Sequence, residues 1–350
     1  MKRSDLTRFC LTVAVILAAA YIAAALPGTY HLIKKIPLGA APGGTEYFDY
    51  ITFDPSTRRV YLSHGTEVKV LEADSGKVLG TVTGLKRDHG IVALNELGRG
   101  FITDGEAREV VVFDLKTFKI TGHIKAGEDA DSLLYDPASK HIFVFNGASK
   151  DATVIDPATE KVLTTIPLGG APEQAVADGK GTIFNNIEDK NEVVVLDSQA
   201  NKIKARWSVM PAGQPVSIAM DRQHRRLFIG GRGPKMLVVM DADTGKIIGQ
   251  PFPIGDRVDT NVFDPETGQI FASTREGTVH IIHEDTPDKY SVVETVKTEF
   301  GAKTMALDPK THNVYVDTSD FDPPLPPTPQ QQNPQPRAKM GTFRLLIYGL

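Results

Sequence analysis

The sequence predicts an all-β fold, a seven-bladed β-propeller with four antiparallel strands in each blade. Two recurring markers and an incomplete last repeat lead to this prediction. The first marker, an apolar residue followed by Asp or Asn, returns every 41 to 44 residues. Its polar residues are Asp54, Asn95, Asp136, Asp178, Asp221, Asp264 and Asp308. A period of this length with four short strands per repeat is typical of propellers.

The second marker is a carboxylate followed five residues later by Lys. It occurs at Glu72/Lys77, Asp114/Lys119, Asp156/Lys161, Asp197/Lys202, Asp241/Lys246 and Glu284/Lys289. Because two independent markers keep one period, chance Asp-Pro runs cannot account for the pattern. In the third repeat we expect strands over residues 132–135, 141–145, 152–155 and 162–166, where Val, Ile, Phe and Tyr dominate.

The last repeat lacks a fourth strand, and the N-terminal segment supplies it. Residues 31–42 match residues 161–172 nearly position for position. Because residues 161–172 begin with the fourth strand of their repeat, residues 31–42 should contain a strand of the same kind. The first strand after the N-terminal apolar stretch is therefore expected to close the seventh blade as its outer strand. This closure also covers a sheet edge that would otherwise invite aggregation.

Residues 1–25 combine Lys2, Arg3 and Arg8 with an apolar stretch from Phe9 to Ala25, which is typical of a signal peptide. The alternative is an uncleaved membrane anchor, since a span needs about 20 apolar residues. Residues 26–350 are expected to form a single propeller domain of an exported protein, periplasmic or extracellular. The one cysteine, Cys10, lies inside the segment that cleavage would remove.

Several phrases carry a family resemblance, such as residues 60–63 (VYLS), 153–156 (TVID) and 314–317 (VYVD). They resemble the YVTN-type propeller repeats of exported bacterial proteins, and the resemblance covers nearly everything after the signal. It implies fold and export, whereas members are described variously as surface-layer, lactonase-like or DNA-associated propellers. A net charge of −4 argues against nucleic acid as the partner.

The candidate site follows from one column of the repeat alignment, five residues before each first marker. Its members are Asp49, Gly90, Asp131, Glu173, Val216, Asp259 and Lys303. First strands line a propeller's channel, so these residues should converge at its mouth. The carboxylates Asp49, Asp131, Glu173 and Asp259 are oxygen donors that suit a divalent cation such as calcium. The alternative is a set of solvated strand starts, and Lys303 would weaken a metal site by neutralising one carboxylate.

Further polar residues fall beside this column or near the ends of second strands. They are His64, His89, Asp104, Asn146, Asn185, Asn186 and Arg275. His, Asn and carboxylate groups together could polarise an ester or hold a metal, while the bland alternative is a set of hydrogen-bonded loop residues. Residues 321–337 are rich in Pro and Gln and are expected to form a loop insertion on the same face.

The function predicted is that of an exported binding or scaffold protein. It would engage a small molecule or a protein on the loop face around the channel, with contact to a membrane only through an uncleaved N-terminal segment. The alternative is a metal-dependent, lactonase-like hydrolase that uses the same mouth. A nucleic-acid binder is the third and least supported hypothesis.

Overall fold

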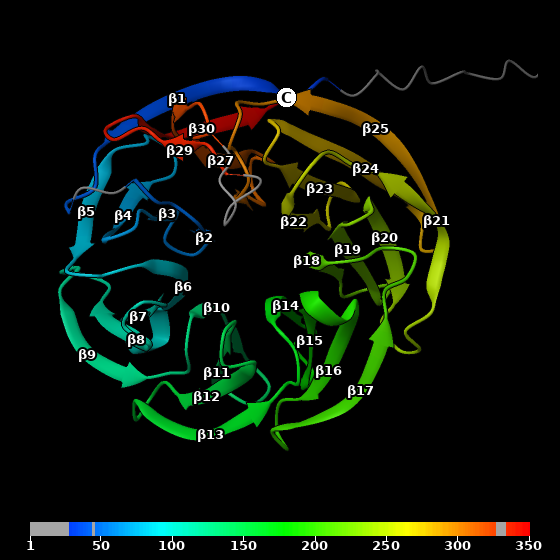
Figure 1. The fold of residues 1–350 in the computed structure, drawn as a ribbon, viewed down its shortest axis with the longest axis horizontal. Helices are drawn as coiled ribbons and strands as arrows, with labels where there is room; N and C mark the ends of the chain where they lie inside the picture. The colour runs from blue at the N-terminus through cyan, green and yellow to red at the C-terminus, as the bar shows by residue number, and fades with distance from the viewer. Residues whose placement is uncertain (1–27, 44–45, 327–333) are drawn as a thin grey trace, which may run out of the picture.

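The computed structural model describes residues 28–43, 46–326 and 334–350, which form a ring of seven four-stranded sheets (Figure 1). The prediction of a seven-bladed propeller is confirmed. Blade 1 contains β2 (Ile51–Asp54), β3 (Arg59–Ser63), β4 (Glu67–Glu72) and β5 (Val78–Thr83). Blade 2 contains β6 (Asp88–Leu94), β7 (Arg99–Asp104), β8 (Glu109–Asp114) and β9 (Ile120–Lys125). Blade 3 contains β10 (Ala130–Asp136), β11 (His141–Asn146), β12 (Asp151–Asp156) and β13 (Lys161–Pro167).

The remaining blades repeat this order. Blade 4 contains β14 (Pro172–Ala177), β15 (Thr182–Ile187), β16 (Glu192–Asp197) and β17 (Lys202–Ser208). Blade 5 contains β18 (Pro215–Asp221), β19 (Arg226–Arg232), β20 (Lys235–Asp241) and β21 (Ile247–Pro253). Blade 6 contains β22 (Val258–Asp264), β23 (Gln269–Thr274), β24 (Thr278–Thr286) and β25 (Lys289–Lys297). Blade 7 contains β26 (Met305–Leu307), β27 (Val314–Thr318), β30 (Phe343–Gly349) and β1 (His31–Gly39).

Short elements join these strands without changing the architecture. Single 3-10 turns, η1 (Asn95–Leu97) and η2 (Glu188–Lys190), follow β6 and β15. The two-residue strands β28 (Phe321–Asp322) and β29 (Arg337–Ala338) pair with each other at the two ends of the predicted insertion, 321–337, between β27 and β30. No helix among the described residues is long and apolar enough to cross a membrane. The predicted signal peptide, residues 1–25, lies outside the described residues.

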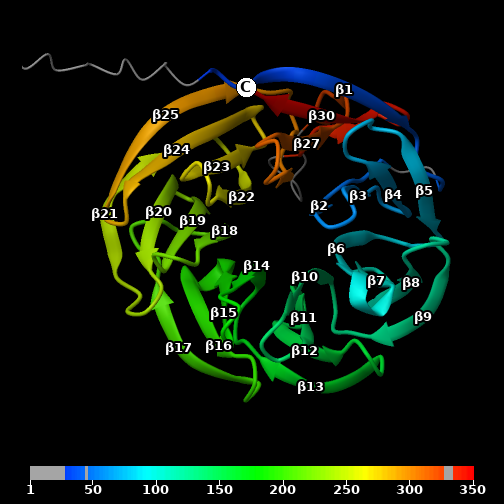
Figure 2. The same ribbon diagram turned by 180° about the vertical axis from the view of Figure 1, so that it is seen from behind.

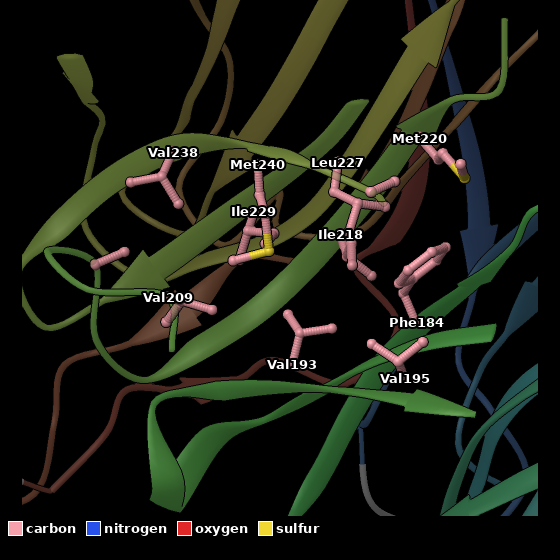
Figure 3. Packing of buried hydrophobic residues seen from close by; sticks show 12 residues of the cluster. Phe184, Val193, Val195, Val209, Ile218, Met220, Leu227, Ile229, Val238 and Met240 are labelled. Atoms are coloured by element: carbon pink, nitrogen blue, oxygen red, sulfur yellow. The ribbon is translucent and has the colours of Figure 1, made fainter. Parts of the chain in front are cut away.

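The hydrophobic core lies between neighbouring blades. Among the described residues, seven clusters of buried side chains each join two adjacent blades. Between blades 4 and 5, Val193 and Val195 of β16 face Ile218 of β18 and Ile229 of β19 (Figure 3). Blades are therefore stabilised mainly by burial against their neighbours, since apolar surface buried away from water contributes about 25 cal/mol per Å².

The recurring Asp of the first marker also joins blades. Its carboxylate accepts hydrogen bonds from its own turn; that of Asp308, for example, accepts from the backbone N–H of Lys310 at 3.0 Å. The same Asp308 binds Arg58 of blade 1, with nitrogen–oxygen distances of 2.9 and 2.7 Å. Asp54, Asp136, Asp178 and Asp264 likewise bind a side chain of the next blade. The first marker therefore recurs because its Asp joins neighbouring blades, and its recurrence is not a sign of a catalytic site.

The ring closes by pairing the two ends of the chain. β1 runs antiparallel to β30, with Ile36 opposite Leu345 and His31 opposite Gly349 (Figures 1 and 2). The sheet order β1-β30-β27-β26 makes β1 the outer strand of blade 7, as the sequence match predicted. Tyr30 anchors the start of this strand, because its hydroxyl donates to the carbonyl of His312 at 2.9 Å and its ring packs edge-on against Phe271.

We expect a protein that lacks residues 1–42, and so begins at Gly43, to lose cooperative thermal unfolding or to melt far below the protein that begins at Gly28. Without β1, the backbone hydrogen-bonding groups of β30 lose their partners, and the apolar side chains that Tyr30, Ile36 and Leu38 cover become exposed. Circular dichroism and calorimetry of both proteins measure the difference. Equal melting temperatures would show that β1 does not hold the ring.

Candidate functional site

Two sets of loops meet on one face of the ring. The loop that enters a blade bonds to the loop between the second and third strands of that blade, as in Gly105 N–H to Arg87 carbonyl, Gly147 N–H to Asp129 carbonyl and Arg275 N–H to Arg257 carbonyl. The innermost strands, β2, β6, β10, β14, β18, β22 and β26, begin at this face and surround the central channel (Figure 1). We call this surface the mouth face.

Asp49 and Lys303 form the centre of a charged network at the mouth. Asp49 lies just before β2, and Lys303 lies just before β26, 254 residues along the chain. The Lys303 ammonium donates to Asp49 at 2.7 Å and to Asp259 of β22 at 3.0 Å. On its other side, Asp49 accepts from the Nδ1 of His89 at 2.7 Å. Two cations thus flank this buried carboxylate.

His89 and Arg232 extend the network in opposite directions. The Nδ1 atom of His89 also lies 3.0 Å from a carboxylate oxygen of Asp131, so one imidazole faces carboxylates of blades 1 and 3. Arg232, at the end of β19, pairs with Asp259. Positive and negative groups therefore alternate around much of the mouth, and each of these six charges has a partner of opposite sign, which offsets the cost of burying it.

Glu173 of β14 is the exception among the four predicted carboxylates. Among the described residues, no side chain donates a hydrogen bond to its carboxyl group, although its backbone carbonyl accepts from Ser132 and Asn185. Burial, followed by the charge of Asp131, raises its pKa well above the ordinary value. Burial, followed by the charges of the four predicted carboxylates, raises the pKa of the Tyr50 phenol well above its ordinary value; the carboxylates are Asp131, Asp49, Glu173 and Asp259.

The network separates the protonation behaviour of its members. Burial alone would disfavour the imidazolium, yet the hydrogen bonds and charges of Asp131 and Asp49 raise the pKa of His89 to about 10. Burial opposes ionisation of Asp49, but Lys303 and His89 outweigh it and hold the pKa of Asp49 below its usual range. Burial raises the pKa of Asp131, and the charge of Asp49 adds to this rise. His89 is therefore a cation at neutral pH.

Three predicted residues lie within blade structure instead of joining this network. His64 is fully buried between Glu46 and Glu67 and stacks on the ring of Phe343 at 4.0 Å. Asn146 donates to Asp151 at 2.7 Å and to Thr153 at 3.0 Å within blade 3. Asn186 donates to the carbonyl of Ser217 at 3.0 Å, which connects blade 4 to blade 5.

Of the other predicted residues near second-strand ends, Asp104 and Asn185 bind loop or strand backbone, whereas Arg275 faces a cleft. Asp104 accepts the backbone N–H groups of Lys86 at 2.8 Å and Arg87 at 3.0 Å, so it fastens a loop. Asn185 donates to the carbonyl of Glu173 at 2.8 Å. Arg275 differs, because it lines the cleft described below.

Sequence reasoning missed two contributors, Arg232 and Tyr47. Arg232 ends the second strand of blade 5, as Asn146 ends that of blade 3, so a search of second-strand ends could have found it. Tyr47 precedes the column by two residues, and its hydroxyl donates to Asp49 at 3.0 Å and lies 3.0 Å from the Nδ1 of His89. Nothing in its spacing distinguishes Tyr47 from a core aromatic.

Gly90 is the member of the column that has no side chain, and close packing against blade 3 is the reason. A Cβ atom there would lie 2.5 Å from Cδ2 of Leu133 and 3.2 Å from the carbonyl oxygen of Asp131. Because only hydrogen fits, β6 approaches β10 closely, and His89 comes within reach of Asp131.

A cleft opens beside the network on the side of blades 6, 7 and 1. It has a volume of about 520 Å³, within the range of small-molecule sites. Its walls include Tyr47 and Phe48 from the loop entering blade 1, together with Arg275, Lys303 and Phe321. Pro336, Arg337, Ala338 and Met340, from the end of the predicted insertion and the residues after it, also line the cleft. The cleft and the charged network share Lys303.

Two groups of side chains among the described residues could hold a metal ion. The first, at the mouth, is Asp49, His89 and Asp131, whose ligand atoms all lie within 4.8 Å of one another. Because His89 is a cation at neutral pH, its ring would have to lose a proton before it could bind an ion. The second is Asp221, His224 and Glu284, in the Asp turn of blade 5. There the His224 ring lies 2.6 Å from Asp221, the capping position that Thr57 occupies toward Asp54 in blade 1. The second group is therefore explained as turn structure.

Comparisons with known proteins support the fold. No family model matches the chain. Hydrazine synthase of Kuenenia stuttgartiensis superposes with a TM-score of 0.70 at 14% sequence identity, over 79% of this chain and 94% of that chain. At this identity the likeness shows a shared propeller fold alone.

One curated relative aligns over most of the sequence. Antigen Lp49 of Leptospira interrogans serogroup Icterohaemorrhagiae serovar copenhageni (strain Fiocruz L1-130) is 23% identical over 328 residues. The alignment covers 84% of this chain and 68% of the relative. Since no family model matches the chain, the resemblance to YVTN-type repeats rests on the short sequence phrases alone.

We expect His89→Gln to destabilise the protein by about 3 kcal/mol at pH 7, because it removes a buried cation between two carboxylates. The ordinary pKa of His is 6.5 and that of folded His89 is about 10. The stabilising imidazolium is thus fully present below pH 6.5 and is lost as the pH rises through 10. The gap between wild type and variant should therefore shrink from pH 6.5 to 10.

Urea denaturation of both proteins across this pH range tests the prediction. Burial raises the pKa of Asp88 to about 8 and the charge of His89 lowers it, so Asp88→Asn is introduced into both proteins to remove the titration of this neighbour from the comparison. His123→Gln, at an exposed histidine of β9, serves as the control. A gap that stays constant with pH would show that His89 is not charged in the fold.

Proposed function

We propose that this chain is an exported propeller that binds a ligand on its mouth face. The observation that carries the proposal is the cleft of about 520 Å³ that opens beside the charged network at the channel mouth. All seven blades contribute a side chain to the network or to its edge, namely Asp49, His89, Asp131, Glu173, Arg232, Asp259 and Lys303. Turns on the opposite face repeat because they join blades, whereas the mouth loops differ between blades, as a ligand face does.

Export is supported by the N-terminal residues and by the comparison. The basic residues and apolar stretch of 1–25 favour a signal peptide, with periplasmic or extracellular delivery. The Leptospira relative is named an antigen, which accords with a protein displayed outside the cytoplasm. A scaffold role for a protein partner uses the same face and belongs to the same proposal.

Thermal-shift screening of the protein against a metabolite library, followed by hydrogen–deuterium exchange, tests the proposal. Stabilising compounds should protect amides in the loops that line the cleft, at 46–48, 298–304 and 337–340, and leave the Asp turns at 136–140 and 221–225 unchanged. The apparent affinity of these compounds should be at least tenfold weaker for Lys303→Met. It should be unchanged for Gln223→Ala, which lies on the opposite face. Protection confined to the Asp turns would refute the assignment of the mouth face.

A cation-dependent hydrolase is the second candidate, and the state of Asp131 and Glu173 favours it. Burial raises the pKa of both, and neither pairs with Lys303, so a hard divalent cation would relieve their repulsion. Asp49, Asp131, Glu173 and Asp259 supply the oxygen donors that calcium prefers. A cation held there would polarise an ester carbonyl.

Calcium, magnesium, manganese and zinc titrations distinguish this candidate. A saturable rise in melting temperature is expected, equivalent to about 2.7 kcal/mol at a hundredfold excess over Kd. Because the cation displaces protons, the rise should be larger at pH 8 than at pH 6. Asp131→Asn with Glu173→Gln should abolish it, while Asp243→Asn, at an exposed carboxylate of blade 5, should not. No saturable shift with any ion would exclude the hydrolase candidate.

A further inference from the structure

The charges that line the cleft are predominantly positive. Its charged lining residues are Glu46, Arg275, Lys303 and Arg337. The Glu46 carboxylate is already occupied, because one oxygen pairs with His64 and the other accepts the backbone N–H of Gly341 at 3.0 Å. The cleft therefore presents cationic groups whose neutralising carboxylate is committed elsewhere.

Arg275 is a partly buried cation that has no counter-ion among the described residues. Its guanidinium has no hydrogen bond or ion pair with residues 28–43, 46–326 or 334–350, and it lies 5.8 Å from the ring centre of Phe321. Burial, followed by the positive charges of Arg257 and Arg232, lowers its pKa. The nearby Asp259 is shared between Lys303 and Arg232. An anion that entered the cleft would supply the missing partner.

Lys303 adds a second donor beside Arg275. An ammonium carries three N–H groups. Two of them point to Asp49 and Asp259, at 2.7 and 3.0 Å, which leaves one for a ligand. A guanidinium fork and an ammonium on adjoining walls match the two oxygens of a carboxylate or a larger oxyanion.

The other walls are aromatic and fixed. Phe321 packs edge-on against Phe300 at 5.1 Å and against Phe48 at 6.4 Å between ring centres. On the far side, Arg87 lies 4.8 Å above the ring of Tyr47, and the Tyr47 hydroxyl is bound by Asp49. Flat, held aromatic rings favour a ligand with a planar apolar body.

We propose that the cleft binds an organic anion, with its carboxylate or equivalent oxyanion on Arg275 and Lys303 and a planar body against Phe321, Phe48 and Tyr47. This inference rests on the proposed binding function and names the chemical class of its ligand. The mouth is then divided in charge: blades 3 and 4 carry Asp131 and Glu173, and blades 5 to 7 carry the cationic wall.

Isothermal titration of the full chain with three probes of one shape tests the charge. The probes are 2-naphthoate, neutral 2-naphthamide and cationic 2-naphthylmethylammonium. We expect 2-naphthoate to bind at least tenfold more tightly than the other two. Arg275→Gln should weaken 2-naphthoate at least tenfold, Arg275→Lys should recover part of the affinity, and Arg206→Gln, on the outer strand β17, should bind like wild type. Melting temperatures of the variants establish that each is folded.

Three outcomes would overturn the inference. Equal binding of all three probes to wild type would remove the anion preference while leaving a ligand in the cleft, so the proposed function would stand. If folded Arg275→Gln bound 2-naphthoate as tightly as wild type, Arg275 would not be the anion's partner, and the proposed function would again stand. Failure of all three probes to bind would reject this ligand class, and the mouth-face proposal would then be decided by its own exchange experiment.

Discussion

The pairing of β1 with β30 is the constraint on which the rest of the molecule depends. Each blade is stabilised by the apolar clusters that it shares with both neighbours, so an open ring would leave two blades with one unburied face each. The channel mouth depends on the same closure. Asp49 and Lys303 are 254 residues apart and meet only because blade 7 lies beside blade 1. Closure therefore determines the site as well as stability.

The two ends of the channel serve different purposes. At one end the recurring Asp residues bond to neighbouring blades, and the requirement for that bond keeps the residues the same from repeat to repeat. At the other end the loops vary in length and sequence, and the chain places its largest insertion there, between β27 and β30. Residues free of the structural bond can differ between blades, which is the condition for building one asymmetric site on a symmetric ring.

Charge balance controls what the mouth can accept. Lys303, His89 and Arg232 neutralise Asp49 and Asp259, so the carboxylates do not form the uniformly acidic ring that their column suggested. His89 also faces Asp131, so the charges left without a partner among the described residues are Glu173 at one side of the mouth and Arg275 at the other. A ligand that carries an anionic group and a planar body complements the second side, whereas a metal ion would complement the first. Both proposals use one mouth without sharing their decisive side chains.

The sequence by itself determined the number of blades, the strand order within them and the closure by the N-terminal strand. These follow from period and alternation, which depend on local backbone geometry and on burial that every repeat shares. It also identified the column that contains Asp49, Asp131, Glu173, Asp259 and Lys303. Only the tertiary structure decided how these charges pair, that His64 and Asn146 lie inside blades, and that Arg275 faces a cleft beside Phe321. Such pairings depend on how close neighbouring blades come, as at Gly90, and on where loops of unequal length end, and a repeat alignment contains neither quantity.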